Sequence, residues 1–235
     1  MKQRRRDEVF PKIAGVIVEG IKKPAIKKAV KDGADAFELR IDTFSDRNIE
    51  ALVKGVESIK GESRTLHIPL IVTVRSKREG GRFSLSDNKR EEIFRALLPY
   101  ADYIDIELSS AARFAGLVRT AKRKKKRVIL SYHNFNSTPP GARLKGLIKK
   151  GRERGGDIVK IATTANSTGD LKRLAGALVE HKRLIVVAMG RFGKPSRVFF
   201  PLLGSLLTYG SITEKSAPGQ LPVKTIKREF GLYGF

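Results

Sequence analysis

The sequence lacks cysteine and tryptophan altogether, and it has only three histidines, His67, His133 and His181. The absence of cysteine excludes disulfides, thiolate metal sites and cysteine nucleophiles together. Three scattered histidines are too few for a histidine-rich metal site. We therefore expect a protein that works without a metal ion.

Long apolar runs are missing as well. No segment approaches the ~20 consecutive apolar residues that cross a bilayer. The first ten residues, MKQRRRDEVF, lack the apolar core of a signal peptide. These absences predict a cytoplasmic protein that does not associate with membranes.

Acidic residues are scarce beside basic ones, with 24 Asp and Glu against 48 Lys and Arg and a net charge of +24. Such an excess attracts phosphates, carboxylates and acidic surfaces. However, basic runs such as Lys122–Arg127 are not interleaved with aromatic residues, as single-strand stacking platforms require. We expect these side chains to cover solvated helix faces and expect no nucleic-acid partner. A basic nucleic-acid-binding protein stays as an alternative that rests on charge alone.

Short runs rich in β-branched residues alternate with segments of helical period, such as 48–56 and 89–98. The predicted strands are Ile13–Val18, Ala36–Arg40, Leu70–Arg75, Tyr103–Leu108, Val128–Tyr132, Ile158–Ala162, Leu184–Met189 and Ser205–Tyr209. Eight such βα units predict an α/β fold, a closed (β/α)8 TIM barrel that buries every strand. With 235 residues and no linker rich in Pro, Gly or Ser, the chain is expected to form a single catalytic domain over 1–235.

Polar side chains collect at the carboxyl ends of these predicted strands, where barrel active sites are built. Glu38 and Arg40 lie on one face of the second strand by period-two alternation, Arg75 ends the third, and His133 follows the fifth. Taken singly, Glu38 with Arg40 or Arg75 is at least as readily explained by a structural ion-pair network. Their meeting at one barrel mouth favours a site for an anionic carbonyl compound.

Lys160 lies inside an otherwise apolar run, Asp157–Ala162. Burial disfavours an ammonium group, so a lysine at this position can become a nucleophile toward a carbonyl substrate. We expect its pKa to fall from ~10.4 toward ~7–8, helped by Arg40 or Arg75. The alternative is a side chain that extends out of the barrel mouth and takes no part in chemistry.

Six segments together resemble type I 3-dehydroquinate dehydratase, a Schiff-base enzyme of the shikimate pathway of aromatic amino acid biosynthesis. They are Glu38–Asp42, Thr73–Arg75 with Glu79–Gly81, Ser131–Phe135, Asp157–Ala162, Ala188–Gly190 and Ser216–Gln220, in the family's order over nearly the whole chain. The resemblance implies a (β/α)8 barrel that dehydrates 3-dehydroquinate, a small anionic substrate, to 3-dehydroshikimate. It also implies a homodimer without a cofactor.

The resemblance implies catalytic roles for three residues. Lys160 forms an imine with the ring ketone, His133 removes the neighbouring proton and helps expel the hydroxyl as water, and Glu79 pairs with His133. Arg197 is implied as the clamp for the substrate carboxylate, and Arg191 is the alternative. The implied substrate-binding residues are Glu38, Arg40, Arg75, Arg197, Ser216, Gln220, Met189 and Tyr209.

A class I aldolase on a barrel is the main alternative enzyme, because it would use the same buried lysine to cleave a carbon–carbon bond. Sugar-phosphate aldolases need a phosphate site, usually a Gly-rich turn that leads into a helix near the last strands. The loop Ser216–Gln220 does not have that pattern, and Gly190 with Gly193 offers little.

Overall fold

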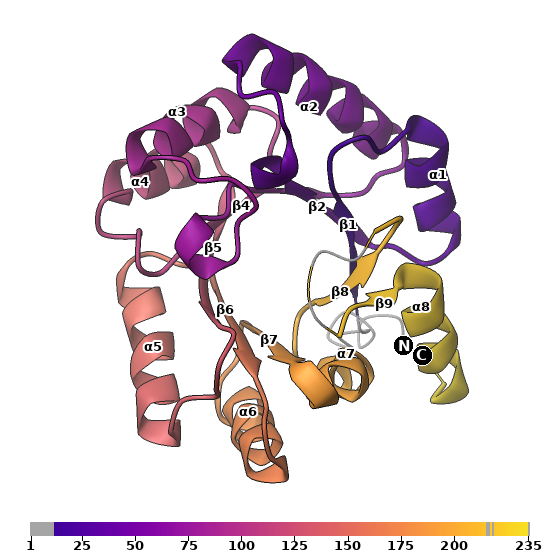
Figure 1. The fold of residues 1–235 in the computed structure, drawn as a ribbon, viewed down its shortest axis with the longest axis vertical. Helices are drawn as coiled ribbons and strands as arrows, with labels where there is room; N and C mark the ends of the chain where they lie inside the picture. Colours follow the sequence, from indigo (N-terminus) through magenta and orange to yellow (C-terminus); the bar gives the residue numbers. More distant parts are fainter. Residues whose placement is uncertain (1–11, 215–216, 218, 235) are drawn as a thin grey trace, which may run out of the picture.

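A ring of helices surrounds a curled sheet of parallel strands in the computed structural model, which describes residues 12–214, 217 and 219–234 (Figure 1). Hydrogen-bonded strands follow the order β7-β6-β5-β4-β3-β2-β1-β8-β9. Every neighbouring pair is parallel. The predicted α/β barrel architecture is confirmed.

The strands agree with the predicted ones to within a few residues. Their bounds are β1 Ile13–Ile17, β2 Ala36–Arg40, β3 Leu70–Thr73, β4 Tyr103–Glu107, β5 Arg127–Asn134, β6 Ile158–Thr164, β7 Leu184–Met189, β8 Thr208–Ser211 and β9 Leu221–Pro222. The two-residue β9 was not predicted, and it pairs with β8 beside the carboxyl end of the barrel.

The eighth strand begins later than predicted, because the segment Ser205–Leu207 closes the barrel instead of pairing along a ladder. Ser205 Oγ accepts a hydrogen bond from the Val186 amide at 3.0 Å and donates to the Leu207 carbonyl. The Leu206 amide donates to the Leu184 carbonyl at 2.9 Å. The Ser205 hydroxyl thus provides one of the hydrogen bonds between β7 and the segment before β8 that a strand ladder would otherwise provide.

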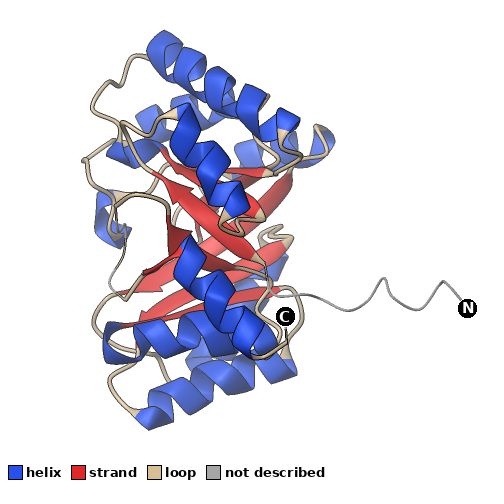
Figure 2. Ribbon diagram, turned by 90° about the vertical axis from the view of Figure 1, so that its right-hand side faces the viewer, coloured by secondary structure: helices blue, strands red, loops and turns tan. Residues whose placement is uncertain are grey.

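The helices lie outside the strands and cover them on all sides (Figure 2). They are α1 Lys23–Lys31, α2 Ile49–Thr65, α3 Asp87–Leu97, α4 Ala115–Arg123, α5 Gly141–Glu153, α6 Thr168–Glu180, α7 Gly193–Leu202 and α8 Val223–Leu232. Side-chain caps set three of their starts: Asn48 for α2, Ser86 for α3, and a capping box of Ser167 with Asp170 for α6. Within the described residues, no helix is long and apolar enough to cross a membrane.

Apolar side chains fill the space inside the sheet as well as the space between strands and helices. Val16, Ile71, Ile129 and Ile185 form one buried cluster across different strands. Two further clusters lie between the strands and the helices. The interior below the site is therefore a packed floor, which leaves the carboxyl ends of the strands as the place for a cavity.

Candidate active site

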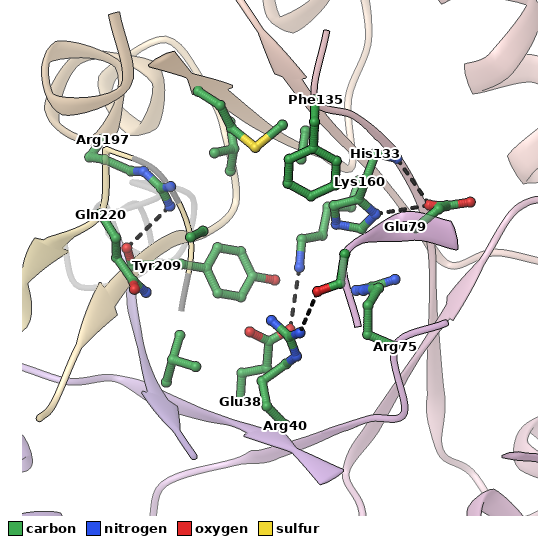
Figure 3. Close-up of a pocket in the computed structure, with 16 residues that line it drawn as sticks. Glu38, Arg40, Arg75, Glu79, His133, Phe135, Lys160, Arg197, Tyr209 and Gln220 are labelled. Carbon is green, nitrogen blue, oxygen red and sulfur yellow. Dashed lines mark hydrogen bonds and ion pairs between the residues drawn. The ribbon is translucent and has the colours of Figure 1, made fainter. Parts of the chain in front are cut away.

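A cavity of about 590 Å³ opens at the carboxyl ends of the strands. Figure 3 shows charged and aromatic side chains from several strands directed into it. Its lining includes every site residue predicted from the sequence except Ser216, which lies outside the described residues: Glu38, Arg40, Arg75, Glu79, His133, Lys160, Met189, Arg197, Tyr209 and Gln220.

Lys160 projects from β6 into this cavity and is 5% exposed. Its Nζ donates to Asp105 Oδ2 at 3.0 Å and to Glu38 Oε1 at 3.3 Å. The same nitrogen lies 4.0 Å from the ring centroid of Tyr209, within range of a cation–π contact. The amine therefore sits between two carboxylates and an aromatic face, which keep it inside the cavity.

The expected fall in the pKa of Lys160 is wrong. Burial does lower this pKa, but Asp105 and Glu38 raise it by more, so that it lies above its ordinary value. Arg75 opposes the carboxylates only weakly. At neutral pH the resting amine is an ammonium ion, and it must give up a proton before it can attack a carbonyl.

His133 and Glu79 form a pair at the edge of the cavity. His133 Nδ1 lies 3.0 Å from Glu79 Oε2, and the His133 backbone amide donates to the same oxygen at 3.1 Å. Ser109 Oγ donates to the other carboxylate oxygen at 2.8 Å. With Glu79 accepting from Nδ1, the second ring nitrogen is left to act on a molecule in the cavity.

The pKa values of this pair keep the imidazole neutral. Burial, together with Arg75 and Lys160, lowers the pKa of His133 well below its ordinary value. Burial raises the pKa of Glu79 to about 7, although the hydrogen bond from Ser109 opposes this. A neutral imidazole can accept a proton, and an anionic partner can then stabilise the imidazolium that forms.

Two glycines bring Glu79 to its position above β5. A Cβ on Gly81 would lie 2.2 Å from the Arg75 carbonyl oxygen, so only glycine allows the loop to turn back on itself here. Gly80 has a φ of 85° and ends the short 3₁₀ turn Lys77–Glu79. The loop after β3 can therefore carry Glu79 across to His133.

Arg40 and Arg75 line the cavity but are already paired with carboxylates. Both Arg40 Nε and Nη2 donate to Asp42, each at 2.8 Å. Arg75 donates to Asp105 at 3.0 Å and to Glu107 at 3.1 Å. A buried ion-pair network is therefore present, as the structural interpretation of these residues expected, and it surrounds a cavity.

Arg197 differs from these two arginines because no carboxylate of the described residues lies within ion-pair distance of it. It is 3% exposed, and Nη1 donates to the Tyr209 carbonyl at 3.2 Å. Its Nε has no hydrogen-bond partner within the described part of the chain. Burial lowers its pKa to about 10. A buried cation without a counter-ion is suited to bind an anion from solution.

Several neighbours complete this side of the cavity. Figure 3 shows Gln220 beside Arg197, with Tyr209 between them and Lys160. Met189 lies at the end of β7 among apolar lining residues. Arg191, the alternative clamp, is exposed, and its guanidinium lies 5.1 Å from the Phe192 ring centroid. It is not among the residues that line the cavity.

Asp105 is the main residue that the sequence analysis missed. It is fully buried, and Ser131 Oγ donates to it at 2.6 Å in addition to its contacts with Lys160 and Arg75. Arg75 and Lys160 hold its pKa well below the ordinary range, against the effect of burial. A signal was present, because two carboxylates, Asp105 and Glu107, alternate within an otherwise apolar strand. Phe135, which also lines the cavity, was noted only as part of a motif.

Comparison with known proteins gives a consistent result. The family model described as type I 3-dehydroquinase matches residues 21–234. A 3-dehydroquinate dehydratase from Aquifex aeolicus is 40% identical over 201 residues, which are 85% of this chain and 88% of that protein. The crystal structure of the Aquifex aeolicus enzyme has a TM-score of 0.83 at 36% identity and covers 95% of this chain and 99% of its own.

A second solved structure is similar over most of its length. It is type I 3-dehydroquinate dehydratase from Clostridium difficile with covalently modified comenic acid. Its TM-score is 0.80 at 30% identity, with 95% of this chain and 92% of that chain covered.

Proposed function

We propose, from the premise that this chain belongs to the type I 3-dehydroquinase family and is a dehydratase, that Lys160 and His133 carry out the reaction through an imine. The overall reaction converts 3-dehydroquinate to 3-dehydroshikimate with loss of one water. The observation that carries the proposal is the placement around one cavity of a buried amine, a neutral imidazole and a buried guanidinium that has no carboxylate within ion-pair distance among the described residues.

Substrate binding begins at Arg197. Its planar guanidinium can bind both oxygens of a carboxylate, and it has no competing counter-ion among the described residues. An anion bound there lies on the Tyr209 side of the cavity, with the ring of the substrate extending toward Lys160. Glu38, Arg40 and Gln220 then surround its hydroxyl groups, and Met189 forms an apolar wall.

Imine formation requires that the ammonium of Lys160 lose a proton. Asp105 is the poorer acceptor, because Arg75 and Lys160 hold its pKa low. Glu38 is the carboxylate that both contacts Nζ and lines the cavity, so we assign the proton to Glu38 or to a water beside it. The neutral amine then adds to the ring ketone, and the carbinolamine loses water to give the protonated imine.

The protonated imine withdraws electrons and acidifies the adjacent C–H bond. The free ring nitrogen of His133 takes that proton, and Glu79 stabilises the resulting imidazolium through Nδ1. The electron pair left on carbon returns through the enamine and expels the β-hydroxyl group, which takes the proton from His133 and leaves as water. Hydrolysis of the imine releases 3-dehydroshikimate and restores the Lys160 amine.

The covalently modified comenic acid held by the Clostridium difficile relative agrees with a covalent mechanism. The aldolase alternative has no comparable support, since the relatives described above are all dehydratases. The homodimer and the cytoplasmic location stay predictions from the sequence, and sedimentation analysis of the purified protein tests the first of them.

A direct assay tests the proposed reaction. The protein is mixed with 3-dehydroquinate, and the conjugated enone of the product is followed by its ultraviolet absorbance. Wild-type protein should produce it, and Lys160→Ala should not. Wild-type protein that folds, binds the substrate and forms no conjugated product would contradict the proposal.

A further inference from the structure

More than half of the net positive charge lies in a stretch that the proposed reaction does not use. Between Glu107 and Glu153 the chain has no acidic residue, and residues 108–152 contain 13 lysines and arginines. The net charge of the whole chain is +24. These cations lie mainly on α4, in the turn that joins α4 to β5, and on α5. We call the surface formed by residues 113–127 and 143–154 the basic face.

The fold brings the two ends of this stretch together. The helices α4 and α5 are neighbours in the outer ring (Figure 1). Lys122 Nζ lies 3.5 Å from Asp157 Oδ1, just beyond the end of α5. Arg152 Nη2 donates to the Lys182 carbonyl at 2.9 Å, so that the loop before β7 adds Lys182 and Arg183 at the border.

Most of these cations have no acidic partner in the part of the chain that the structure describes. Three ion pairs involve the basic face there: Lys122 with Asp157, Lys145 with Glu180, and Lys149 with Glu153 at 3.9 Å. Within the described residues, the following exposed side chains have no carboxylate within ion-pair distance: Arg119, Arg123, Lys124, Lys125, Arg127, Arg143, Lys150 and Arg154.

Helix ends explain only part of this arrangement. The C-terminus of a helix favours cations, which accounts for Lys122 and Arg123 on α4 and for Lys150 and Arg152 on α5. It does not account for the run Lys124–Arg127 beyond α4. That run borders a surface cleft of about 710 Å³ together with Asp102, which is already paired with Lys60.

Cations crowd one another around this cleft. Burial lowers the pKa of Lys126, and Lys60, Arg64 and Lys124 lower it further, while Asp102 opposes them. Such crowding is relieved by an anion that carries several charges.

The surface chemistry distinguishes between kinds of anionic partner. Stable protein interfaces usually bury a core of apolar and aromatic side chains. The basic face exposes no large hydrophobic side chain; those exposed in the described chain lie elsewhere, at Phe135, Val179, Phe199, Leu203, Leu232 and Tyr233. Without exposed aromatic rings it also offers no stacking platform for unpaired bases.

We propose, contrary to the expectation drawn from the sequence alone, that the basic face binds the phosphate backbone of double-stranded nucleic acid without regard to sequence. A duplex presents closely and regularly spaced negative charges and needs neither an apolar core nor stacking. The densest part of the face, residues 122–127 and 149–154, lies at the C-terminal ends of α4 and α5, beside the amino ends of β5 and β6 and away from the carboxyl ends where the cavity opens. Binding there leaves the cavity open.

The test compares two triple variants that remove the same number of positive charges. The first is Lys124→Gln, Lys125→Gln and Lys150→Gln, on the basic face. The control is Lys31→Gln, Lys54→Gln and Lys224→Gln, three exposed lysines with no ion pair among the described residues and outside the basic face. Fluorescence anisotropy with a labelled duplex of about 20 base pairs is recorded over a series of salt concentrations.

The wild type should bind the duplex with a linear fall of log affinity against log salt concentration. The basic-face variant should lose about tenfold or more in affinity, and its salt slope should be shallower by about 3. The control variant should change the slope by less than about 1. Dehydration of 3-dehydroquinate should be unaffected in both variants, which separates this proposal from the proposed reaction.

Three outcomes would overturn the proposal. One is equal weakening in both variants, which would assign the attraction to net charge alone. Another is tighter binding of a single strand of the same length or of poly-glutamate, which would assign the face to a different polyanion. The third is no measurable binding at about 50 mM salt.

Discussion

The two ends of the barrel use lysine and arginine in opposite ways. At the carboxyl end, Lys160 and Arg75 are buried and Arg40 is partly buried, and all three are held by carboxylates at 2.8–3.0 Å. On the basic face, whose densest part lies beside the amino ends of β5 and β6, nearly all of the cations are exposed, and most have no acidic neighbour among the described residues. Burial without pairing is too costly for a charge, whereas an exposed charge is solvated by water.

Arg197 is an exception among the basic side chains of the cavity, because it is buried without a carboxylate partner among the described residues. It shares this lack with most of the exposed cations of the basic face. An unpaired buried cation has more to gain from an anion than an exposed one, because water is not there to screen it. The difference predicts tight, specific binding in the cavity and weak, salt-sensitive binding on the basic face.

Lys160→Ala should have the largest effect. Loss of the nucleophile should lower kcat by roughly 10⁴-fold or more, because the covalent route is closed. Steady-state kinetics measures the loss, and circular dichroism checks that the variant is folded. Lys160→Arg is the matched control, since it keeps a cation beside Asp105 yet forms no stable imine. Substantial turnover by either variant would show that the amine is not the nucleophile.

His133→Ala should come next, with a loss of about 10³-fold in kcat. Imine formation should survive, because Lys160 and its two carboxylates are untouched. Trapping with borohydride should therefore still label the variant in the presence of 3-dehydroquinate. Normal turnover, or loss of labelling together with turnover, would contradict the division of roles between the two residues.

Asp105→Asn tests the pairing that distinguishes the cavity from the basic face. Removing this charge leaves Arg75 and Lys160 with fewer counter-ions and should cost roughly 3 kcal/mol in the free energy of unfolding. It should also lower the pKa of Lys160, so that imine formation begins at a lower pH than in the wild type. The pH dependence of borohydride labelling measures this shift. A profile that moves to higher pH would contradict the assigned role of Asp105.

Glu79→Gln should produce a smaller effect that depends on pH. The pKa of Glu79 is raised from 4.5 to about 7 in the folded state, so the folded state loses stability as the pH rises from the lower value to the higher one, and the loss is complete above about pH 7. Glu79→Gln removes this loss. The unfolding free energy of the variant minus that of the wild type should therefore be about 2 kcal/mol larger at pH 8 than at pH 5. Denaturant unfolding at the two pH values measures this. Its activity should fall, and the loss of wild-type activity below about pH 7 should disappear.

Lys150→Gln on the basic face should have the smallest effect of all. Lys150 is exposed and has no acidic partner among the described residues, so its removal should change the unfolding free energy by no more than about 0.5 kcal/mol. Thermal unfolding measures the change. A loss above about 2 kcal/mol would mean that the basic face is structural.

The barrel could be predicted from the sequence, because buried parallel strands and amphipathic helices leave distinct periodic patterns. The segment Ser205–Leu207 was wrongly predicted as part of a strand. It closes the barrel through the hydroxyl of Ser205, which a strand pattern in the sequence does not reveal. The cavity residues were found by resemblance of motifs more than by physics, and the structure brings all of them that it describes to one place.

The sign of the shift in the pKa of Lys160 could not be predicted in the same way. It depends on which charged group lies within about 3 Å, and Asp105 is 55 residues away in the sequence. The alternating carboxylates of Tyr103–Glu107 indicate a polar face on this strand, but they do not show that Lys160 contacts Asp105. The basic face was visible as composition, but its contiguity required the fold.

Borohydride reduction in the presence of 3-dehydroquinate tests the central claim most directly. The reduced protein is digested and analysed by mass spectrometry. The account predicts a single covalent adduct on the peptide that contains Lys160, absent without substrate and absent from Lys160→Arg. Continued dehydration with no adduct, or an adduct on another lysine with Lys160 unmodified, would contradict it.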